Sequence, residues 1–227
     1  MQNNYRHEYK FLISPSAAAL LKLRLPHVMR RDPHAGPEGM YTIRSLYFDD
    51  PNYSAFWDKV DGVDNRTKYR IRCYNGDTSH CRLERKEKHG NLTRKTSQAI
   101  TPQDALALQN GDFFGCPDHP TGLTEELRKL CATGGMRPIV LVDYDRTPFV
   151  CVSGNTRITL DENLRTRPYC PDLFAPSTCM IPVMEKDEVV LEVKFDDFLP
   201  GYLRDALSDI PKTAMSISKF AMCTNLI

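Results

Sequence analysis

Charged side chains alternate along residues 64–99, and their types and spacing suit the binding of phosphate. Successive side chains of a β-strand point to opposite faces, so Lys68, Arg70 and Arg72 share one face of the first predicted strand. A second strand places four more charged residues in one phase: Arg82, Glu84, Lys86 and Lys88. Guanidinium and ammonium groups bind phosphate oxygens well, so this face is a candidate phosphate-binding surface.

The two strands are separated by Asn75–Gly76, a pair typical of hairpin turns, and we expect the loop to be longer than two residues. The alternative is that this hairpin is an ordinary half-buried sheet with a solvated charged face. A single hairpin does not decide between them, because charge patterns alone are weak evidence.

The composition of the chain and the distribution of its charges help to decide between a phosphate-binding surface and an ordinary sheet. The chain has 227 residues, 41% of them hydrophobic and 26% charged, which predicts a soluble globular protein with one domain over residues 1–227. Its net charge is only +1, yet residues 64–99 hold ten basic and four acidic residues, which leaves 20 basic and 25 acidic residues elsewhere. A general nucleic-acid binder is more often basic overall, so we expect a focused anion site and no nucleic-acid partner.

The sequence shows neither an 18-residue apolar run nor an apolar region near the N-terminus, so we expect no transmembrane helix and no secretory signal. The eight cysteines lack paired spacing and are expected to be reduced thiols in the cytoplasm. Cys116 and His119 have the spacing of a zinc ligand pair, but without a second pair we interpret them as a coincidence within a loop. The chain has no Gly-x-x-x-x-Gly-Lys-Ser/Thr motif, which excludes a P-loop nucleotide site.

At least five predicted strands oppose a charged face of mixed sign to an apolar face. These strands lie near residues 5–13, 40–49, 64–100, 138–152, 156–161 and 188–195. Helices are predicted after Ser14 and Thr101 and from Thr124. We therefore predict a mainly β (α+β) fold: a closed antiparallel barrel with a charged interior and peripheral helices. Such a lumen would be neutralised by several linked phosphates with a divalent metal.

Eight short motifs carry a resemblance over nearly the whole chain. They are YRHEYKF, RSLYFDD, KYRIRCY, LERKEK, YDRTPF, TRITLD, VVLEVKF and SISKF. In order and phase the chain resembles the triphosphate tunnel metalloenzymes (the CYTH-like superfamily), and within them the VTC-type polyphosphate polymerase domain. The first strand reads Arg6-x-Glu8-x-Lys10, where the superfamily usually has Glu-x-Glu-x-Lys. The polymerase branch shares this departure.

The resemblance implies an eight-stranded antiparallel tunnel that binds ATP and passes its γ-phosphoryl group to a growing polyphosphate chain with Mn²⁺ or Mg²⁺. It implies these catalytic residues: Lys10, Arg70, Arg72, Lys86 and Glu192. It implies these contacts to phosphate or nucleotide: Arg6, Lys10, Lys68, Arg70, Arg72, Lys86, Arg146, Arg157, Lys194 and Lys219. It implies Glu192, with Glu8 and Glu84, as metal ligands. For Arg44 and Arg94 two interpretations are equally favoured: a place on the phosphate-binding surface, or an ordinary position on a solvated sheet. The strand at 138–147 is expected to place Asp143 in its polar phase.

Two other functions stay open at this point. One is a triphosphatase of the same fold, with water as acceptor, acting on a small triphosphate. The other is a non-catalytic module that binds polyphosphate or a nucleotide without metal. The product formed from ATP, and the effect of chelation on binding, distinguish them. The sequence leaves open the acceptor, the chain length, the oligomeric state and any membrane-protein partner.

Overall fold

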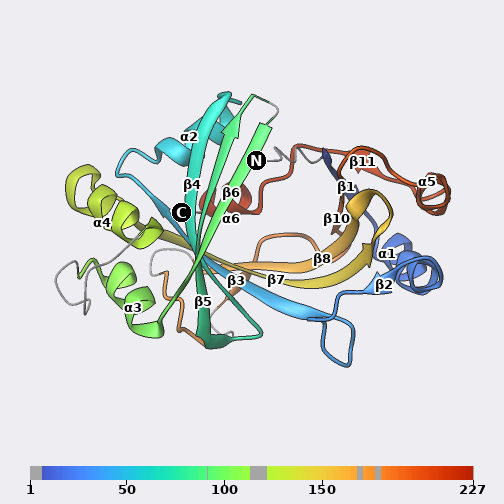
Figure 1. The fold of residues 1–227 in the computed structure, drawn as a ribbon, viewed down its shortest axis with the longest axis horizontal. Helices are drawn as coiled ribbons and strands as arrows, with labels where there is room; N and C mark the ends of the chain where they lie inside the picture. Colours follow the sequence, from blue (N-terminus) through green and yellow to red (C-terminus); the bar gives the residue numbers. More distant parts are fainter. Residues whose placement is uncertain (1–6, 91, 113–121, 168–170, 177–179, 227) are drawn as a thin grey trace. The chain divides into compact units, whose positions relative to one another are not determined.

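The computed structural model describes residues 7–90, 92–112, 122–167, 171–176 and 180–226 (Figure 1). By its contacts the chain forms two compact units. Unit 1 comprises Met1–Thr42, Tyr144–Leu164 and Pro182–Ile217. Unit 2 comprises Ile43–Asp143, Arg165–Ile181 and Ser218–Ile227. Three long strands, β3, β7 and β8, have residues in both units.

Unit 1 is built on antiparallel strands in the order β11-β1-β10-β8-β7, with short pairings of β2 to β7 and β9 to β8. The strand bounds are β1 His7–Ile13, β2 Arg30–Arg31, β7 Arg137–Cys151, β8 Thr156–Arg167, β9 Ile181–Pro182, β10 Val189–Phe195 and β11 Thr213–Ala214. The helices are α1 Pro15–Arg24, the 3₁₀ turn η1 Leu25–His27, and α5 Gly201–Ser208, with a further 3₁₀ turn η2 at Ser153–Asn155.

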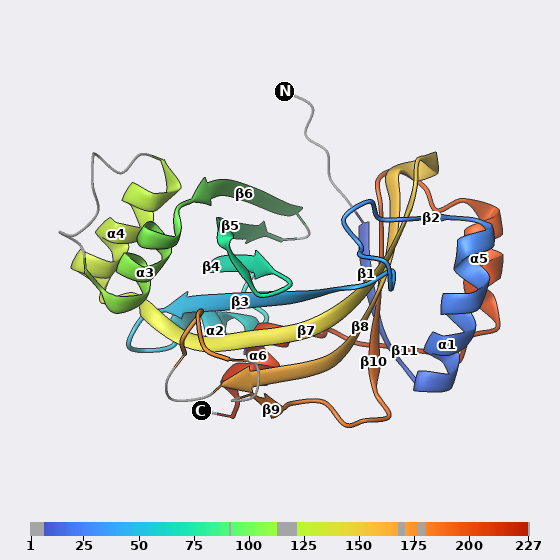
Figure 2. The ribbon, with the colours of Figure 1, turned by 90° about the horizontal axis from the view of Figure 1, so that it is seen from below.

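The core of unit 1 lies between these strands and helices α1 and α5, which cover one side of β1 and β10 (Figure 2). The core forms because every second side chain of a strand points to the same face of the sheet. Ile158 and Leu160 of β8 and Leu191 of β10 all face this core and are fully buried. As predicted, Ser14 caps α1, accepting a hydrogen bond from the amide of Ala17 at 3.2 Å.

Unit 2 continues with strands in the order β7-β3-β4-β5-β6, and Figure 2 shows β3 to β6 stacked in this order. The bounds are β3 Tyr41–Asp49, β4 Asn65–Tyr74, β5 Asp77–His89 and β6 Leu92–Ile100. The helices are α2 Ser54–Val60, α3 Pro102–Asn110, α4 Leu123–Gly134 and α6 Lys219–Thr224. Helices α3 and α4 cover the apolar face of this sheet, where Phe48, Ile71 and Leu83 are fully buried. The charged phase of β4 and β5 faces away from them.

Local predictions fared unevenly. Thr101 caps α3 in a reciprocal capping box with Asp104, as expected. Thr124 does not cap α4, because Gly122 precedes the helix and Thr124 lies inside it. The prediction of a loop longer than two residues at Asn75–Gly76 is also wrong. Asn75 and Gly76 alone connect β4 to β5, and both have positive φ, as the twist of a tight hairpin requires.

The prediction of a closed barrel is corrected by the strand order, which begins at β11 and ends at β6 without a hydrogen-bonded return among the described residues. The second edge of β1 instead pairs with the short strand β11 at Phe11 and Leu12. The mainly β architecture, with a large antiparallel sheet and peripheral helices, is confirmed. Within the described ranges, no helix is long and apolar enough to cross a membrane.

Candidate functional site

Unit 2 carries a charged surface that we call the β4–β6 face, defined by five cations and one carboxylate. Its residues are Lys68, Arg70, Arg72, Glu84, Lys86 and Lys95. The strand register brings them together, because Arg70 lies opposite Glu84 and Lys86 lies between Lys68 and Lys95. Residues directly opposite in antiparallel strands have side chains on the same face. The alternation predicted for β4 and β5 is therefore confirmed.

Glu84 is the electrostatic centre of the β4–β6 face and is almost completely buried. Its Oε2 accepts a hydrogen bond from Arg70 Nε at 2.8 Å and lies 3.9 Å from Arg72 Nε, while its Oε1 contacts the Lys95 ammonium. Burial alone would raise the pKa of Glu84, but Arg70, Arg72 and Lys95 outweigh it and lower the pKa to about 2. One carboxylate is thus shared among three cations.

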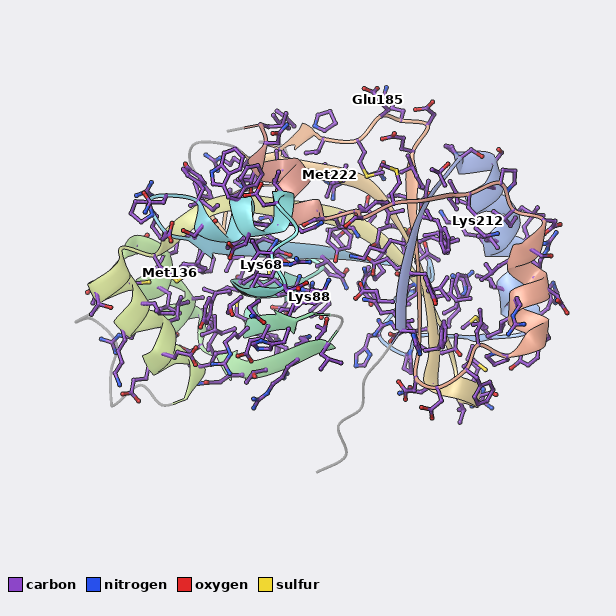
Figure 3. All side chains as sticks on the ribbon, turned by 90° about the horizontal axis from the view of Figure 1, so that it is seen from above. Lys68, Lys88, Met136, Glu185, Lys212 and Met222 are labelled. Carbon is purple, nitrogen blue, oxygen red and sulfur yellow. The ribbon has the colours of Figure 1, made fainter. Side chains whose placement is uncertain are left out.

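Lys68 lies at the end of the face away from this carboxylate and is half-buried. Figure 3 shows Lys68 and Lys88 on neighbouring strands of the hairpin. The Lys68 ammonium sits 4.2 Å from the centre of the Phe220 ring, which in turn packs on Tyr47 at 4.9 Å between centroids. Burial, followed by repulsion from Arg66 and other cations, lowers the pKa of Lys68 to about 7. This end of the face therefore has excess positive charge.

The two arginines of the β4–β6 face differ in how many of their donors are occupied. Arg70 donates from Nη1 to the Tyr47 hydroxyl at 2.8 Å and also binds Glu84. Arg72 is 7% exposed, and its Nε makes one long hydrogen bond of 3.4 Å to Ser45. Lys219, which its sequence context would place on a solvated helix surface, is 9% exposed at the start of α6. Arg72 is the cation best placed to accept an anionic ligand.

Unit 1 carries a second charged surface, the β1–β10–β8 face. Its residues are Glu8, Lys10, Arg157, Thr159, Glu192 and Lys194. Their signs alternate across the strands: Glu8 lies opposite Lys194, and Lys10 lies opposite Glu192. The Lys10 ammonium is 3.3 Å from Glu8 and 3.6 Å from Glu192, and the Lys194 ammonium is 3.4 Å and 3.1 Å from the same two carboxylates. Two lysines thus bridge two glutamates.

Arg146 of β7 binds carboxylates instead of presenting a free guanidinium fork. It makes a bidentate pair with Asp161, at 2.6 Å from Nε and 2.7 Å from Nη2, and Nη2 also lies 3.4 Å from Glu192. Burial opposes the charged form, but Asp161 and Glu192 hold the pKa of Arg146 well above its usual range. Its predicted contact with phosphate would have to use the remaining Nη1.

Arg157 is oriented by two residues that no local sequence pattern identifies. Its Nη2 donates to Asp32 Oδ2 at 2.8 Å and to the Tyr41 hydroxyl at 2.7 Å. Asp32 lies in a Pro/Gly-rich loop more than 120 residues away in the chain, and it also binds His34. No local periodicity links such distant residues.

The family resemblance implies a divalent metal, so the carboxylates were tested for fit. Among the described residues no group of three or more His, Cys, Asp or Glu is arranged to hold a metal ion. Glu8 and Glu192 nevertheless offer hard oxygen donors on adjacent strands. Mg²⁺ commonly uses one or two carboxylates and completes its shell with water and substrate phosphate oxygens. Glu8 and Glu192 fit that pattern, because they lie on paired strands of the same unit, whereas Glu84 belongs to the other unit.

The structure decides the positions of Arg44 and Arg94, which the sequence left evenly balanced. Arg44 does not join the β4–β6 face: it lies in the apolar phase of β3, where Nε and Nη2 bind Asp143 at 2.9 and 2.8 Å. Asp143 is fully buried in this pair. On β6, Lys95 lies on the charged face and Arg94 pairs opposite Glu87 in the other phase. Three residues considered in the sequence lie outside the described part of the chain: Arg6, Cys116 and His119.

Comparisons with known proteins agree with this geometry. The VTC domain model matches residues 5–227, and no curated protein sequence matches the chain. The crystal structure of a "putative adenylate cyclase" from Bacillus halodurans superposes with a TM-score of 0.51 at 15% identity, covering 92% of this chain and 89% of that one. The PH1012 protein from Pyrococcus horikoshii OT3 gives 0.49 at 11% identity, with 95% and 99% covered. Because the family model spans nearly the whole chain, the chain belongs to the VTC domain family.

Proposed function

We propose that the protein is a metal-dependent polyphosphate polymerase. In this reaction a terminal oxygen of the polyphosphate chain attacks the γ-phosphorus of ATP. The bond from that phosphorus to the β–γ bridging oxygen breaks, ADP leaves, and the chain gains one phosphate. Phosphoryl transfer depends on positioning and charge neutralisation more than on covalent help from the protein. Because the attacking phosphate is already ionised, no general base is required.

The observation that carries this proposal is the excess of cations on the β4–β6 face, where five cations surround one buried carboxylate. Glu84 is bound by three cations, and Arg72, which is 7% exposed, makes only long contacts, at 3.4 Å to Ser45 and 3.9 Å to Glu84. Burial, followed by repulsion from neighbouring cations, lowers the pKa of Lys68 to about 7. Buried charge without compensation is costly, so a face of this kind is expected to be completed by an anionic ligand. Several linked phosphates supply multiple negative charges and multiple oxygen acceptors.

Each residue set has a distinct part in the proposal. Arg70, Arg72 and Lys86 hold phosphoryl oxygens on the β4–β6 face, and Lys10 and Lys194 do so in unit 1. A divalent metal, when bound, would neutralise charge on the triphosphate. Glu8 and Glu192 are the carboxylates whose chemistry suits it. Lys10 and Lys194, which now bridge them, would then be released toward phosphate.

The test is incubation of purified protein with ATP and Mn²⁺, followed by gel staining for polyphosphate and assay of ADP and orthophosphate. ADP formed together with a stained polymer supports the proposal. Orthophosphate as the sole phosphate product would identify water as the acceptor, and the protein would be a triphosphatase. The matched variants are Arg72→Ala, which should lose activity, and Arg94→Ala, which removes a cation of the same sheet from the other phase and should not.

A non-catalytic binding module would behave differently. It would bind tripolyphosphate equally well with Mn²⁺ or EDTA and would form neither ADP nor polymer. The arrangement of Glu8 and Glu192 on adjacent strands favours the metal-dependent enzyme, because a module that only binds anions gains nothing from two carboxylates on its cationic face.

A further inference from the structure

Two buried donors near the start of strand β8 have no hydrogen-bond partner among the described residues. They are the hydroxyl of Thr159 and the Nε of Arg157. Thr159 is 1% exposed, so its hydroxyl is also cut off from bulk water. The residues are two apart in an extended strand, so both side chains lie on the β1–β10–β8 face. Buried polar groups are almost always hydrogen-bonded, and two exceptions side by side call for an explanation.

The neighbours of these donors are known from the strand register. Thr159 lies directly opposite Glu192, and Arg157 lies directly opposite Lys194. The Glu192 carboxylate is already engaged by Lys10, Lys194 and Arg146. The donors of Thr159 and Arg157 thus lie beside a carboxylate whose oxygens already contact three cations.

The guanidinium of Arg157 is held in one orientation. Asp32 Oδ2 and the Tyr41 hydroxyl both accept from its Nη2, at 2.8 and 2.7 Å. Asp32 is itself buried and fixed by hydrogen bonds from the backbone and ring nitrogens of His34, both at 2.9 Å. A guanidinium anchored at one nitrogen cannot turn to satisfy Nε elsewhere. The Nε of Arg157 therefore keeps its present direction.

The movable parts of this face are the two lysines. The side chains of Lys10 and Lys194 are 24% and 29% exposed, whereas those of Glu192 and Thr159 are buried. Lysine has a flexible stem and three donors, so it can exchange a carboxylate for another oxyanion at low cost. An entering anion would draw Lys194 away from Glu8 and Glu192 and would reach the hydroxyl and Nε beneath.

We propose that Thr159 Oγ1, Arg157 Nε and Lys194 Nζ together form a seat for one phosphoryl group, with Asp32 and Tyr41 as positioning residues for Arg157. The seat deepens the proposed function, since it assigns one phosphate of the substrate to unit 1. A hydroxyl, a guanidinium edge and an ammonium donate to three different oxygens of a tetrahedral oxyanion. A carboxylate, with two oxygens, cannot offer a separate oxygen to each of the three donors.

The test compares two threonines of the same strand. Thr159→Val removes the unpartnered hydroxyl and keeps the shape. Thr156→Val removes a hydroxyl that is equally buried, at 1% exposed, but whose Oγ1 donates to the Ser153 carbonyl at 2.9 Å. Tripolyphosphate binding is measured by titration calorimetry in EDTA, and stability by thermal melting without ligand.

Opposite results are expected from the two variants. Thr159→Val should bind tripolyphosphate about tenfold or more weakly, because a hydrogen bond to a charged oxygen is lost, while its melting temperature stays level or rises. Thr156→Val should melt lower but, if folded, bind as the wild type does. If Thr159→Val binds tripolyphosphate with wild-type affinity, the proposal is overturned, and the hydroxyl has only an internal role.

A second variant tests the positioning residues. Tyr41→Phe removes one of the two acceptors of Arg157 Nη2 without touching the anion. We expect it to weaken tripolyphosphate binding in the wild-type background and to have a smaller effect on top of Arg157→Ala. Equal effects in both backgrounds would contradict the positioning role.

The outcome is separable from that of the proposed function. If the wild type makes no polyphosphate but Thr159→Val still weakens tripolyphosphate binding, the polymerase proposal fails and the seat stands. If the wild type makes polyphosphate and Thr159→Val binds normally, the seat is wrong and the polymerase stands.

Discussion

Replacing Lys68 with arginine should remove a coupling between phosphate binding and proton uptake. In the free protein the pKa of Lys68 is lowered to about 7, and a bound polyphosphate should return it toward its ordinary 10.5 by supplying negative charge. Between pH 6 and pH 8 the charged fraction of a group with this pKa falls from about 90% to about 10%. Binding should therefore weaken about tenfold over this range. Arginine stays charged throughout, so the weakening should be absent from Lys68→Arg.

The assay is calorimetric titration of tripolyphosphate at pH 7 in two buffers with different ionisation enthalpies, which counts the protons taken up. The wild type should take up about half a proton more than Lys68→Arg, since Lys68 is half-charged at its pKa. Protonation of the ligand cancels in this difference because the ligand is the same. Equal proton uptake by both proteins would refute the reasoning. The sign for folding is opposite: the unfolded chain binds more protons between pH 7 and 10.5, so stability relative to Lys68→Arg should rise with pH there.

Three further predictions follow from the ion pairs. Glu192→Gln should abolish ATP turnover but bind tripolyphosphate in EDTA at least as tightly as the wild type, because it removes a carboxylate that competes with phosphate for the nearby cations. Glu84→Gln should lose a stabilisation of about 3 kcal/mol that the wild type has above pH 4.5 and loses as the pH falls toward 2, measured by urea unfolding at several pH values. Arg44→Met should lower the free energy of unfolding by about 3–5 kcal/mol, since the Asp143 carboxylate is left buried without its bidentate partner.

Each of these has a matched control. For Glu192→Gln the control is Glu188→Gln, which changes a glutamate just before β10 and should leave turnover intact. A Glu84→Gln protein whose stability runs parallel to the wild type from pH 5 to pH 3 would show that Glu84 is not the titrating group. Adding Asp143→Leu to Arg44→Met should recover much of the lost stability, because no buried charge then remains. If the double variant is no more stable, the loss at Arg44 comes from its contacts with the Leu173 and Ala175 carbonyls.

The β4–β5 hairpin shows how far sequence reasoning extends. Alternation with a period of two assigns Lys68, Arg70 and Arg72 to one face, and the register then places Glu84 opposite Arg70. This worked because part of the opposite phase of each strand is apolar and buried in the core with α3 and α4: Tyr69, Ile71 and Cys73 in β4, and Cys81 and Leu83 in β5. A buried apolar face fixes the phase of a strand, since a slip by one residue would expose it.

The phase of β6 could not be read in this way. Its residues are charged or polar on both faces and largely exposed, so nothing in the sequence distinguishes Arg94 from Lys95. Arg44 was ambiguous for a related reason: its guanidinium lies in an apolar phase only because Asp143, about a hundred residues away, neutralises it. The contact of Asp32 with Arg157 joins a loop to a strand and has no local signature. All three placements depend on contacts between residues that are far apart in the chain. A single sequence does not show such contacts.

The strands β3, β7 and β8 pass from one compact unit into the other without a break, and the chain crosses between the units at five points. Neither unit is therefore a contiguous piece of sequence that could be cut out or expressed alone. If one unit unfolded alone, one part of each of β3, β7 and β8 would unfold while the other part stayed in the folded unit. We expect a single cooperative unfolding transition. The two charged faces should accordingly be lost together in any protein damaged enough to lose one.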